Sequence, residues 1–403
     1  MRKPGIRRAV SLLAFLFALA PALAAAPARP AARNMLGNPG FERQLGGHDW
    51  MPAGWDTSDA GLPTVFFGRD SFLVHGGKFS VNIANTSTLY SMGHNWSQTL
   101  LVGRETWGKT AVFSAWTLSN GVQGRAYLLL QAYRDTVSKM SRIWGVDRED
   151  ARKRMGINKI DDPLIDLGWK RLQFEDPQTE WVRREVRVVV PVGVNVLFCR
   201  CGLLGTGQLI VDDASLTLEP TPPAPQYAAG TNLFADPGFE QGGDAWEIAV
   251  PPFEGARIDR DSTVAHSGRL SMRCSNMNDG LTSARMGVCQ AISARGLAGK
   301  RLRLTGWFRG DSLVSRAYVS LYFHSRRGMI PAGTTEQLSG TFDWTRPSVE
   351  MDVPPGTDEL WAWLMFDAPC RGRLWIDDGV LEVLGPATGV PARSAPPAAE
   401  KPR

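Results

Sequence analysis

Two tryptophans spaced two residues apart are the first candidates for chemistry in this sequence. Trp361 and Trp363 lie in a run of apolar residues that is typical of a β-strand. Because side chains alternate across a strand, both rings point to the same side. Aromatic rings left facing water are costly unless they bind something that is partly apolar. This spacing therefore predicts a surface that binds by stacking.

Residues for covalent or acid–base catalysis form no recognisable motif. The sequence has no Gly-x-Ser-x-Gly, no His-Glu-x-x-His and no phosphate loop. A glycosidase needs two carboxylates across a cleft. The candidate acids for such a pair all lie in the segment 135–180, and the sequence does not place any two of them together. They are Glu149, Asp150, Asp161, Asp162 and Asp166. We expect no catalytic residues, and a glycosidase hidden in the first half of the chain is the less favoured alternative.

The N-terminus has the three parts of an export signal. Basic residues at positions 2, 3, 7 and 8 precede an apolar run from Ala9 to Leu19, and Ala22-Leu23-Ala24 offers a cleavage site. We predict a signal peptide over 1–24, a periplasmic or secreted protein, and no membrane span after its removal. Losing these four basic side chains takes the net charge from +5 to about +1. Nucleic acid is therefore disfavoured as a partner.

Five cysteines are present: Cys199, Cys201, Cys274, Cys289 and Cys370. Export permits disulfides, but an odd number leaves at least one thiol unpaired in a monomer. We expect Cys274 and Cys289 on neighbouring strands, which makes them the first pair to test. Five buried thiols are the alternative. There is no Cys-x-x-Cys pair, so a zinc site has no support.

An internal repeat organises the chain. Asn38-Pro39-Gly40-Phe41-Glu42 recurs as Asp236-Pro237-Gly238-Phe239-Glu240, and further motifs follow in the same order in both halves. The later matches are His75-Gly76-Gly77 with His266-Ser267-Gly268, Trp116 with Trp307, Trp181 with Trp344, and Asp212-Asp213 with Asp377-Asp378. Chance does not supply such a series, so the chain contains two copies of one domain.

Composition between the copies sets the expected boundaries. We expect disorder over 25–33, a first domain over 34–219, a Pro-rich linker over 220–231, a second domain over 232–384 and a disordered tail over 385–403. Short alternating runs punctuated by Gly, Pro, Asn and Asp predict an all-β fold of two tandem β-sandwiches, with Arg301–Arg309 and Ala317–His324 as two of the separate strands. The first copy alone has an insertion over 135–180, and its charged stretch 147–154 predicts one or two helical turns.

The series of motifs resembles carbohydrate-binding modules of families four and nine, in the galactose-binding-like jelly-roll group. The likeness rests on the Pro-Gly-Phe-Glu opening, the His-Ser-Gly loop, the Gly-Lys before a Trp strand, the Trp before a Val-Pro segment and the closing Asp-Asp strand. It covers 34–219 and 232–384. The resemblance implies a jelly-roll fold and a non-catalytic protein that binds poly- or oligosaccharide.

The resemblance also implies one structural calcium ion in each copy. Its ligands would be the first-strand Glu, the closing Asp and backbone carbonyls of the loop between them, which suits a hard cation. Carried over to this sequence, the metal ligands are Glu42 and Asp212 in the first copy and Glu240 and Asp377 in the second, with Asp70 and Asp261 as lesser candidates. The alternative is that these acids only cap turns.

Strand alternation assigns the candidate carbohydrate-binding side chains. Arg200 aligns with Trp363 and Phe198 with Trp361, and an arginine without a partner is almost never buried in a core, so this face should point outward. Sugars stack on aromatic rings, and polar side chains bind their hydroxyls. The expected groove residues are Trp361, Trp363, Trp307, Tyr318, Tyr322 and Arg309 in the second copy, and Trp116, Tyr127, Gln131, Tyr133, Phe198 and Arg200 in the first.

These assignments have structural rivals that the sequence leaves open. Trp116 and Trp307 would be packing residues if a loop or the other domain covered them, and Trp361 and Trp363 would serve equally in an interface between the domains. The insertion would either fold over the first groove or stay a solvated loop. An adhesive or structural protein-interaction module at the cell surface is the main functional alternative. Sugar identity and oligomeric state are not determined by the sequence.

Overall fold

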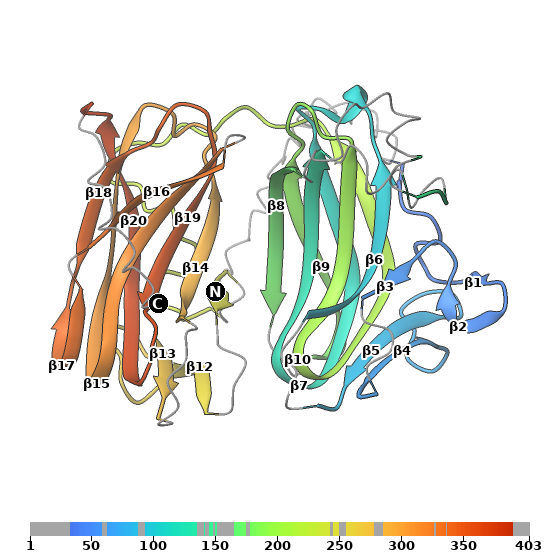
Figure 1. Ribbon diagram of the computed structural model, residues 1–403, viewed down its shortest axis with the longest axis horizontal. Coiled ribbons are helices and arrows are strands. Elements are labelled where there is room, and N and C mark those ends of the chain that lie inside the picture. The colour runs from blue at the N-terminus through green and yellow to red at the C-terminus, as the bar shows by residue number, and fades with distance from the viewer. Residues whose placement is uncertain are drawn as a thin grey trace, which may run out of the picture. The chain divides into compact units, whose positions relative to one another are not determined.

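The structure is a computed structural model of the 403-residue chain. It describes residues 33–58, 63–87, 93–134, 141, 145–147, 150, 165–174, 178–241, 245–249, 255–277, 285–325, 328–335 and 337–389. Within this part of the chain nearly all regular structure is β-strand, which confirms the all-β prediction (Figure 1). Strands β3–β10 and β11–β20 form separate hydrogen-bonded groups, and β1 pairs only with β2. We call β1–β10 the first sandwich and β11–β20 the second.

The described residues of the first sandwich form ten strands. They are β1 (Gln44–Leu45), β2 (His48–Pro52), β3 (Asp56–Thr57), β4 (Val65–Asp70), β5 (Ser80–Asn85), β6 (Gly93–Leu101), β7 (Thr110–Arg134), β8 (Ile165–Phe174), β9 (Gln178–Val189) and β10 (Val196–Glu219). A short 3-10 turn, η1 (Arg104–Thr106), precedes β7. The strands β7 and β10 are so long that each one contributes to two layers.

Those two layers follow from the strand registers. The front sheet consists of β3, β6, the first half of β10, the second half of β7, and β8, with Val196–Leu204 of β10 paired to both β6 and β7. The back sheet consists of β4, β5, the second half of β10, the first half of β7, and β9. Both sheets contribute to one core, in which side chains such as Phe113, Leu128 and Leu197 are fully buried.

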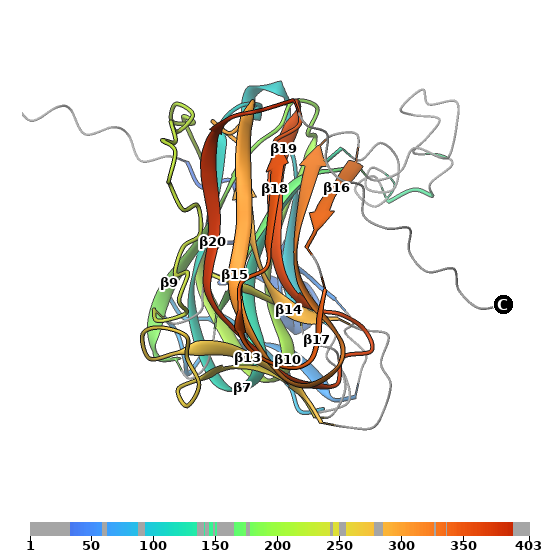
Figure 2. The ribbon, with the colours of Figure 1, turned by 90° about the vertical axis from the view of Figure 1, so that its left-hand side faces the viewer.

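The second sandwich repeats this plan. Its strands are β11 (Glu247–Ala249), β12 (Ala256–Asp261), β13 (Ser271–Asn276), β14 (Met286–Ser293), β15 (Lys300–Ser325), β16 (Gly328–Thr334), β17 (Leu338–Thr345), β18 (Ser348–Asp352), β19 (Thr357–Phe366) and β20 (Gly372–Pro386). The front sheet is β11, β14, β19, the second half of β15, and β16. The back sheet is β12, β13, β20, the first half of β15, β17 and β18, and its strands β20, β15 and β18 run side by side in Figure 2.

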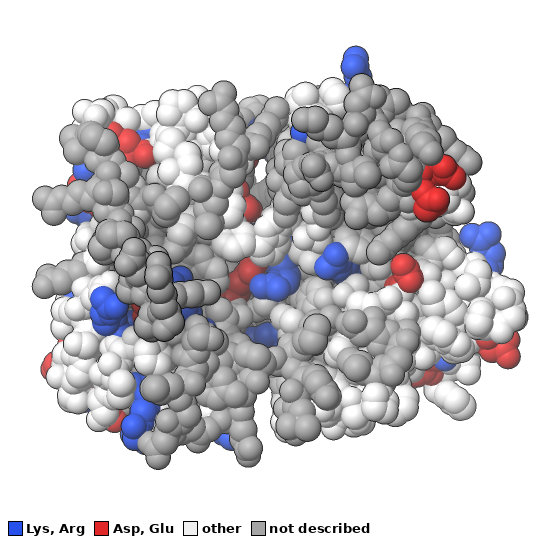
Figure 3. Space-filling view, viewed as in Figure 1, with Lys and Arg blue, Asp and Glu red and all other residues white. Residues whose placement is uncertain are grey.

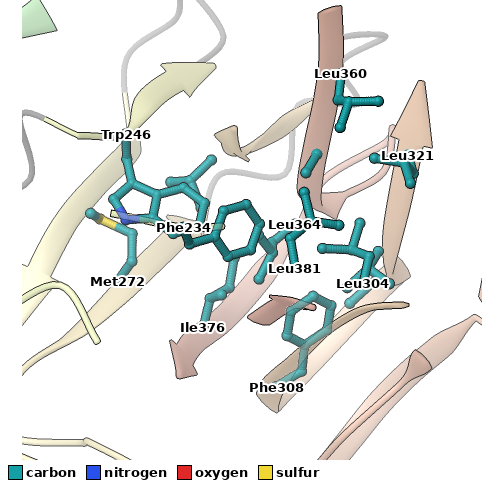
Figure 4. Close-up of a cluster of buried hydrophobic side chains, with 14 of the residues drawn as sticks. Phe234, Trp246, Met272, Leu304, Phe308, Leu321, Leu360, Leu364, Ile376 and Leu381 are labelled. Carbon is teal, nitrogen blue, oxygen red and sulfur yellow. The ribbon is translucent and has the colours of Figure 1, made fainter. Parts of the chain in front are cut away.

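A separate apolar core holds the two sheets of the second sandwich together. Trp246, Leu304, Phe308 and Leu364 lie there at 1% exposure or less, and Figure 4 shows them in one cluster. Leu304 and Phe308 come from β15, Leu364 from β19 and Trp246 from the residue before β11. Burying a side chain of this size stabilises a fold by about 2–3 kcal/mol. Each sandwich therefore has its own source of stability.

Three sequence-based expectations need correction. Arg301–Arg309 and Ala317–His324 are not separate strands but parts of the single strand β15. The described part of the insertion contains a strand that was not expected, β8, which pairs with β7. Its helical residues in the described part are Ser141 and Asp150 alone, and most of 147–154 lies outside the described residues. Cys274 and Cys289 lie on β13 and β14, which do not pair with each other, and all five cysteines are buried free thiols.

No described helix is long and apolar enough to cross a membrane. Positive and negative side chains are scattered among uncharged ones on the face of the described residues seen in Figure 3.

Candidate functional site

The outward face of the second front sheet carries a strip of aromatic side chains. Trp361 pairs in register with Tyr322, and Trp363 pairs with Ser320, so all four side chains lie on one side of the sheet. The rings of Trp361 and Trp363 are 6.2 Å apart between centroids. Both indoles and the Tyr322 ring are half-buried, whereas the alternate residues of the same strands belong to the core. The strip is thus a surface feature and not part of the core.

Polar groups border this strip. The Nε1 of Trp361 donates to Oε2 of Glu359 at 2.8 Å, which fixes the indole. The imidazole of His324 lies 4.6 Å from the Trp361 ring at an interplanar angle of 32°, and burial lowers its pKa. Tyr318 is 4% exposed, and burial raises its pKa to about 12, so it is a neutral phenol at physiological pH. The strip therefore combines stacking surfaces with hydrogen-bonding groups.

The front sheet of the first sandwich has the same register with different side chains. Phe198 pairs with Gln131 and Arg200 with Leu129, which matches the positions of Trp361 and Trp363 in the second sandwich. The guanidinium of Arg200 lies 4.0 Å from the centroid of the Phe198 ring. These outward side chains stand outside the apolar core cluster, although Tyr127 and Tyr133 are only 4% and 8% exposed. The accessible residues of this face are Gln131, Phe198 and Arg200, which are half-buried.

Trp116, Trp307 and Arg309 do not join these faces. They lie on the back-sheet halves of β7 and β15, since each long strand passes from one sheet to the other. Trp116 stacks on His75 with a centroid distance of 4.0 Å, and Trp307 stacks on His266 at 4.1 Å. Both tryptophans are therefore covered on one face by the loop that carries the histidine.

These rings belong to a cluster that recurs in both sandwiches. We call it the histidine cluster; it comprises His75, Trp116, Trp181 and Asp213 in the first sandwich, and His266, Trp307, Trp344 and Asp378 in the second. In each copy the histidine Nδ1 lies 2.7 Å from an aspartate oxygen. The sequence analysis did not predict this contact, although the four residue types recur at matched positions in the two halves of the sequence and could have indicated it.

The acids expected to bind calcium accept hydrogen bonds from the backbone of the loop that carries the histidine. In the first sandwich Oδ2 of Asp212 accepts from the backbone amides of His75 and Gly76, and Oε1 of Glu42 accepts from those of Lys78 and Phe79. In the second sandwich Asp377 and Glu240 make the equivalent bonds with 266–270. The carboxylates thus converge on one short loop in each copy.

Burial gives the two aspartates of these loops, Asp212 and Asp377, an unusual electrostatic position. Desolvation raises the pKa of Asp212, and it raises the pKa of Asp377 to about 6. A buried carboxylate of this kind fits a hard cation, which would compensate its charge with further oxygens from the backbone. Among the described residues there is no group of three or more His, Cys, Asp or Glu side chains suited to a metal, so such a site would depend on carbonyl ligands.

Asp70 and Asp261 have other partners. Oδ1 of Asp70 accepts from the amides of Phe72 and Leu73 in the turn after β4. Asp261 pairs with Arg273 at 3.0 Å and accepts from Nε1 of Trp375. Both acids therefore act as turn caps or pairing groups in this structure.

Trp361 makes one further ring contact. The Trp169 ring of β8 meets it edge-on, with centroids 4.8 Å apart. One side of the Trp361 indole is therefore in contact with protein.

Comparisons with known proteins concern the fold. No family model and no curated protein matches the chain. Among solved structures, the tandem CBM22-1-CBM22-2 domain of Paenibacillus barcinonensis Xyn10C is 13% identical over 84% of this chain and 95% of that chain, with a TM-score of 0.31. The C-terminal family 22 module of Clostridium thermocellum Xyn10B is 15% identical over 40% of this chain and 96% of that chain, with a TM-score of 0.29.

A third similar structure is TmCBM61 in complex with beta-1,4-galactotriose, which is 20% identical over 47% of this chain and 100% of that chain, with a TM-score of 0.28. These three structures belong to families 22 and 61, not to the families four and nine named from the sequence. Since one fold hosts many functions, the function has to come from the side chains themselves.

Proposed function

We propose that this chain is an exported, non-catalytic protein that binds poly- or oligosaccharide on the front sheets of its sandwiches. The observation that carries the proposal is the strip of Trp361, Trp363 and Tyr322 on the outer face of one sheet. Sugar rings present flat C–H patches that stack on such indoles, and Glu359 and His324 supply hydrogen bonds at the edge. Export follows from the N-terminal signal expected over 1–24.

Binding of the full chain to a panel of neutral and acidic glycans tests this function. We expect Trp361→Ala and Trp363→Ala each to weaken binding about tenfold, because each removes one stacking surface. Trp50→Ala is the matched control, since Trp50 of β2 is 41% exposed and lies outside the front sheet. Isothermal titration calorimetry gives the affinities. Failure of the wild type to bind any glycan would instead favour a protein-interaction module.

We further propose that each sandwich holds a structural calcium ion near its histidine loop. Glu42 and Asp212 would hold it in the first sandwich, and Glu240 and Asp377 in the second. The support is the buried carboxylate in each copy and its convergence with a second carboxylate on one loop. The ion would neutralise the buried charge and fix the loop, and it would not contact the sugar.

A further inference from the structure

One position of the register that the two front sheets share carries a cation in one sheet and a ring in the other. Arg200 occupies the place that Trp363 has in the second sandwich, and Leu129 and Ser320 are their respective cross-strand partners. The neighbouring position changes from Trp361 to Phe198. The first sandwich thus replaces one stacking ring of the strip with a cation.

Arg200 has no anionic partner within the described part of the chain. Its Nε is buried and makes no hydrogen bond, and its guanidinium rests on the Phe198 ring. The Oε1 atom of Gln131, across from Phe198, is likewise buried without a hydrogen-bond partner. A buried polar atom left without a partner costs free energy. Three neighbouring side chains on one face therefore offer a ring, a cation and an unused amide oxygen.

A second arginine lies near Arg200. Arg171 of β8 lies on the same row, because Leu129 pairs with both arginines, one on each side. The charges of Arg200 and Arg171 both act to lower the pKa of Tyr127, against the larger effect of burial, so both guanidiniums lie near that phenol. Arg171 Nη2 pairs with Glu247 at 2.8 Å, but its Nε has no partner. Asp56 is exposed at the far end of the row, opposite Ser97.

The ring of Tyr127 closes the other side of this site. Tyr127 is paired with Gly202, and a Cβ atom at position 202 would overlap the Tyr127 ring. The phenol therefore lies flat across the strand next to Arg200. A glycine here leaves room for an aromatic floor beside the guanidinium.

We propose that the first sandwich is specific for an acidic glycan, whose anionic group binds Arg200 while its ring stacks on Phe198. The second sandwich, with Trp363 at the same position, takes neutral sugar. This inference rests on the proposed carbohydrate-binding function and names the ligand class of one of its two sites. A planar guanidinium matches a carboxylate or sulfate oxygen pair, and Gln131 Oε1 accepts from a neighbouring hydroxyl. Uronic acids and sulfated sugars share this chemistry.

The test compares acidic and neutral ligands on the full chain. Oligogalacturonate is matched with a neutral β-1,4-galacto-oligosaccharide of equal length, and dextran sulfate with dextran. We expect Arg200→Gln to weaken binding of the acidic ligand roughly 10- to 100-fold and to leave the neutral ligand within about twofold. The matched control is Arg183→Gln, which removes one charge from exposed β9 of the back sheet and should change neither affinity.

Each outcome decides the inference. Loss of affinity for either anionic ligand in Arg200→Gln alone supports it, and the two acidic probes then tell carboxylate from sulfate. An unchanged affinity for both acidic ligands in Arg200→Gln, or an equal loss in Arg183→Gln, overturns it while leaving carbohydrate binding intact. Absence of all glycan binding overturns the proposed function as well. Thermal unfolding checks that each variant is folded. If Arg200→Gln unfolds, the same comparison of acidic and neutral ligands is made with Arg200→Lys, which keeps the charge but not the bidentate geometry.

Discussion

His324 shows how one residue can belong to both the fold and the binding strip. Its imidazole lies tilted against the Trp361 ring, and its Nε2 is buried without a hydrogen-bond partner. Burial lowers its pKa, so the folded protein holds the neutral ring. In the unfolded chain a histidine takes up a proton near pH 6.5. Protonation therefore opposes folding at this position.

Acidification should destabilise the second sandwich through this histidine. Stability is fully present above the unfolded-state pKa of about 6.5 and is lost as the pH falls from there through the lowered folded-state pKa. We expect the thermal midpoint to fall less between pH 7 and pH 5 in His324→Gln than in the wild type. The exposed His48 gives the control variant His48→Gln, which should follow the wild type. Equal slopes in all three proteins would contradict the assignment.

Glycines at the bends of β7 and β10 decide how these strands change sheets. Gly124 and Gly205 both have positive φ, of 122° and 106°, and they face each other in register. A Cβ atom on Gly205 would overlap the carbonyl oxygen of Gln123, and one on Gly124 would overlap that of Leu204. The close approach of two backbones lets one pair of strands serve both layers. This bend separates Trp116 from Tyr127.

Alanine at the bend should cost far more than alanine at an open glycine. We expect Gly205→Ala to lower the free energy of unfolding by about 3 kcal/mol or more, since the strained φ and the overlap add. Gly108→Ala is the control, because Gly108 has a φ of 74° but nothing lies near its missing Cβ; its cost should stay near 1 kcal/mol. Urea unfolding measures both. Similar values for the two variants would rule out the packing argument.

At the scale of the whole molecule, duplication gives each sandwich its own apolar core and the same arrangement of acids around its histidine loop. The apolar clusters of the two sandwiches share no residue. In both, a fully buried aspartate accepts from the amides of the histidine loop, at Asp212 and at Asp377. A bound cation stabilises only the folded state, so its effect should appear in both sandwiches.

Chelation tests the proposed calcium ions. We expect the thermal midpoint to fall on adding EDTA and to recover with excess calcium. Each bound ion should add about 2.7 kcal/mol to the free energy of unfolding when calcium is at a hundredfold its dissociation constant. Replacing Glu42 and Glu240 together by Gln should abolish this calcium-dependent increment. Asp56→Asn, an exposed acid away from the loop, should retain it. A midpoint unaffected by EDTA in calorimetry would exclude structural calcium.

The sequence alone determined the all-β class and the duplication, because alternation and turn residues are local signals. The common register of Phe198 and Arg200 with Trp361 and Trp363 also follows from alternation. Only the tertiary structure decided that β15 is one strand crossing two sheets, which moves Trp307 and Arg309 to the back sheet. It also decided that part of the insertion pairs as β8 and that His75 covers Trp116. These outcomes depend on which distant strands pair, and local sequence patterns do not encode that choice.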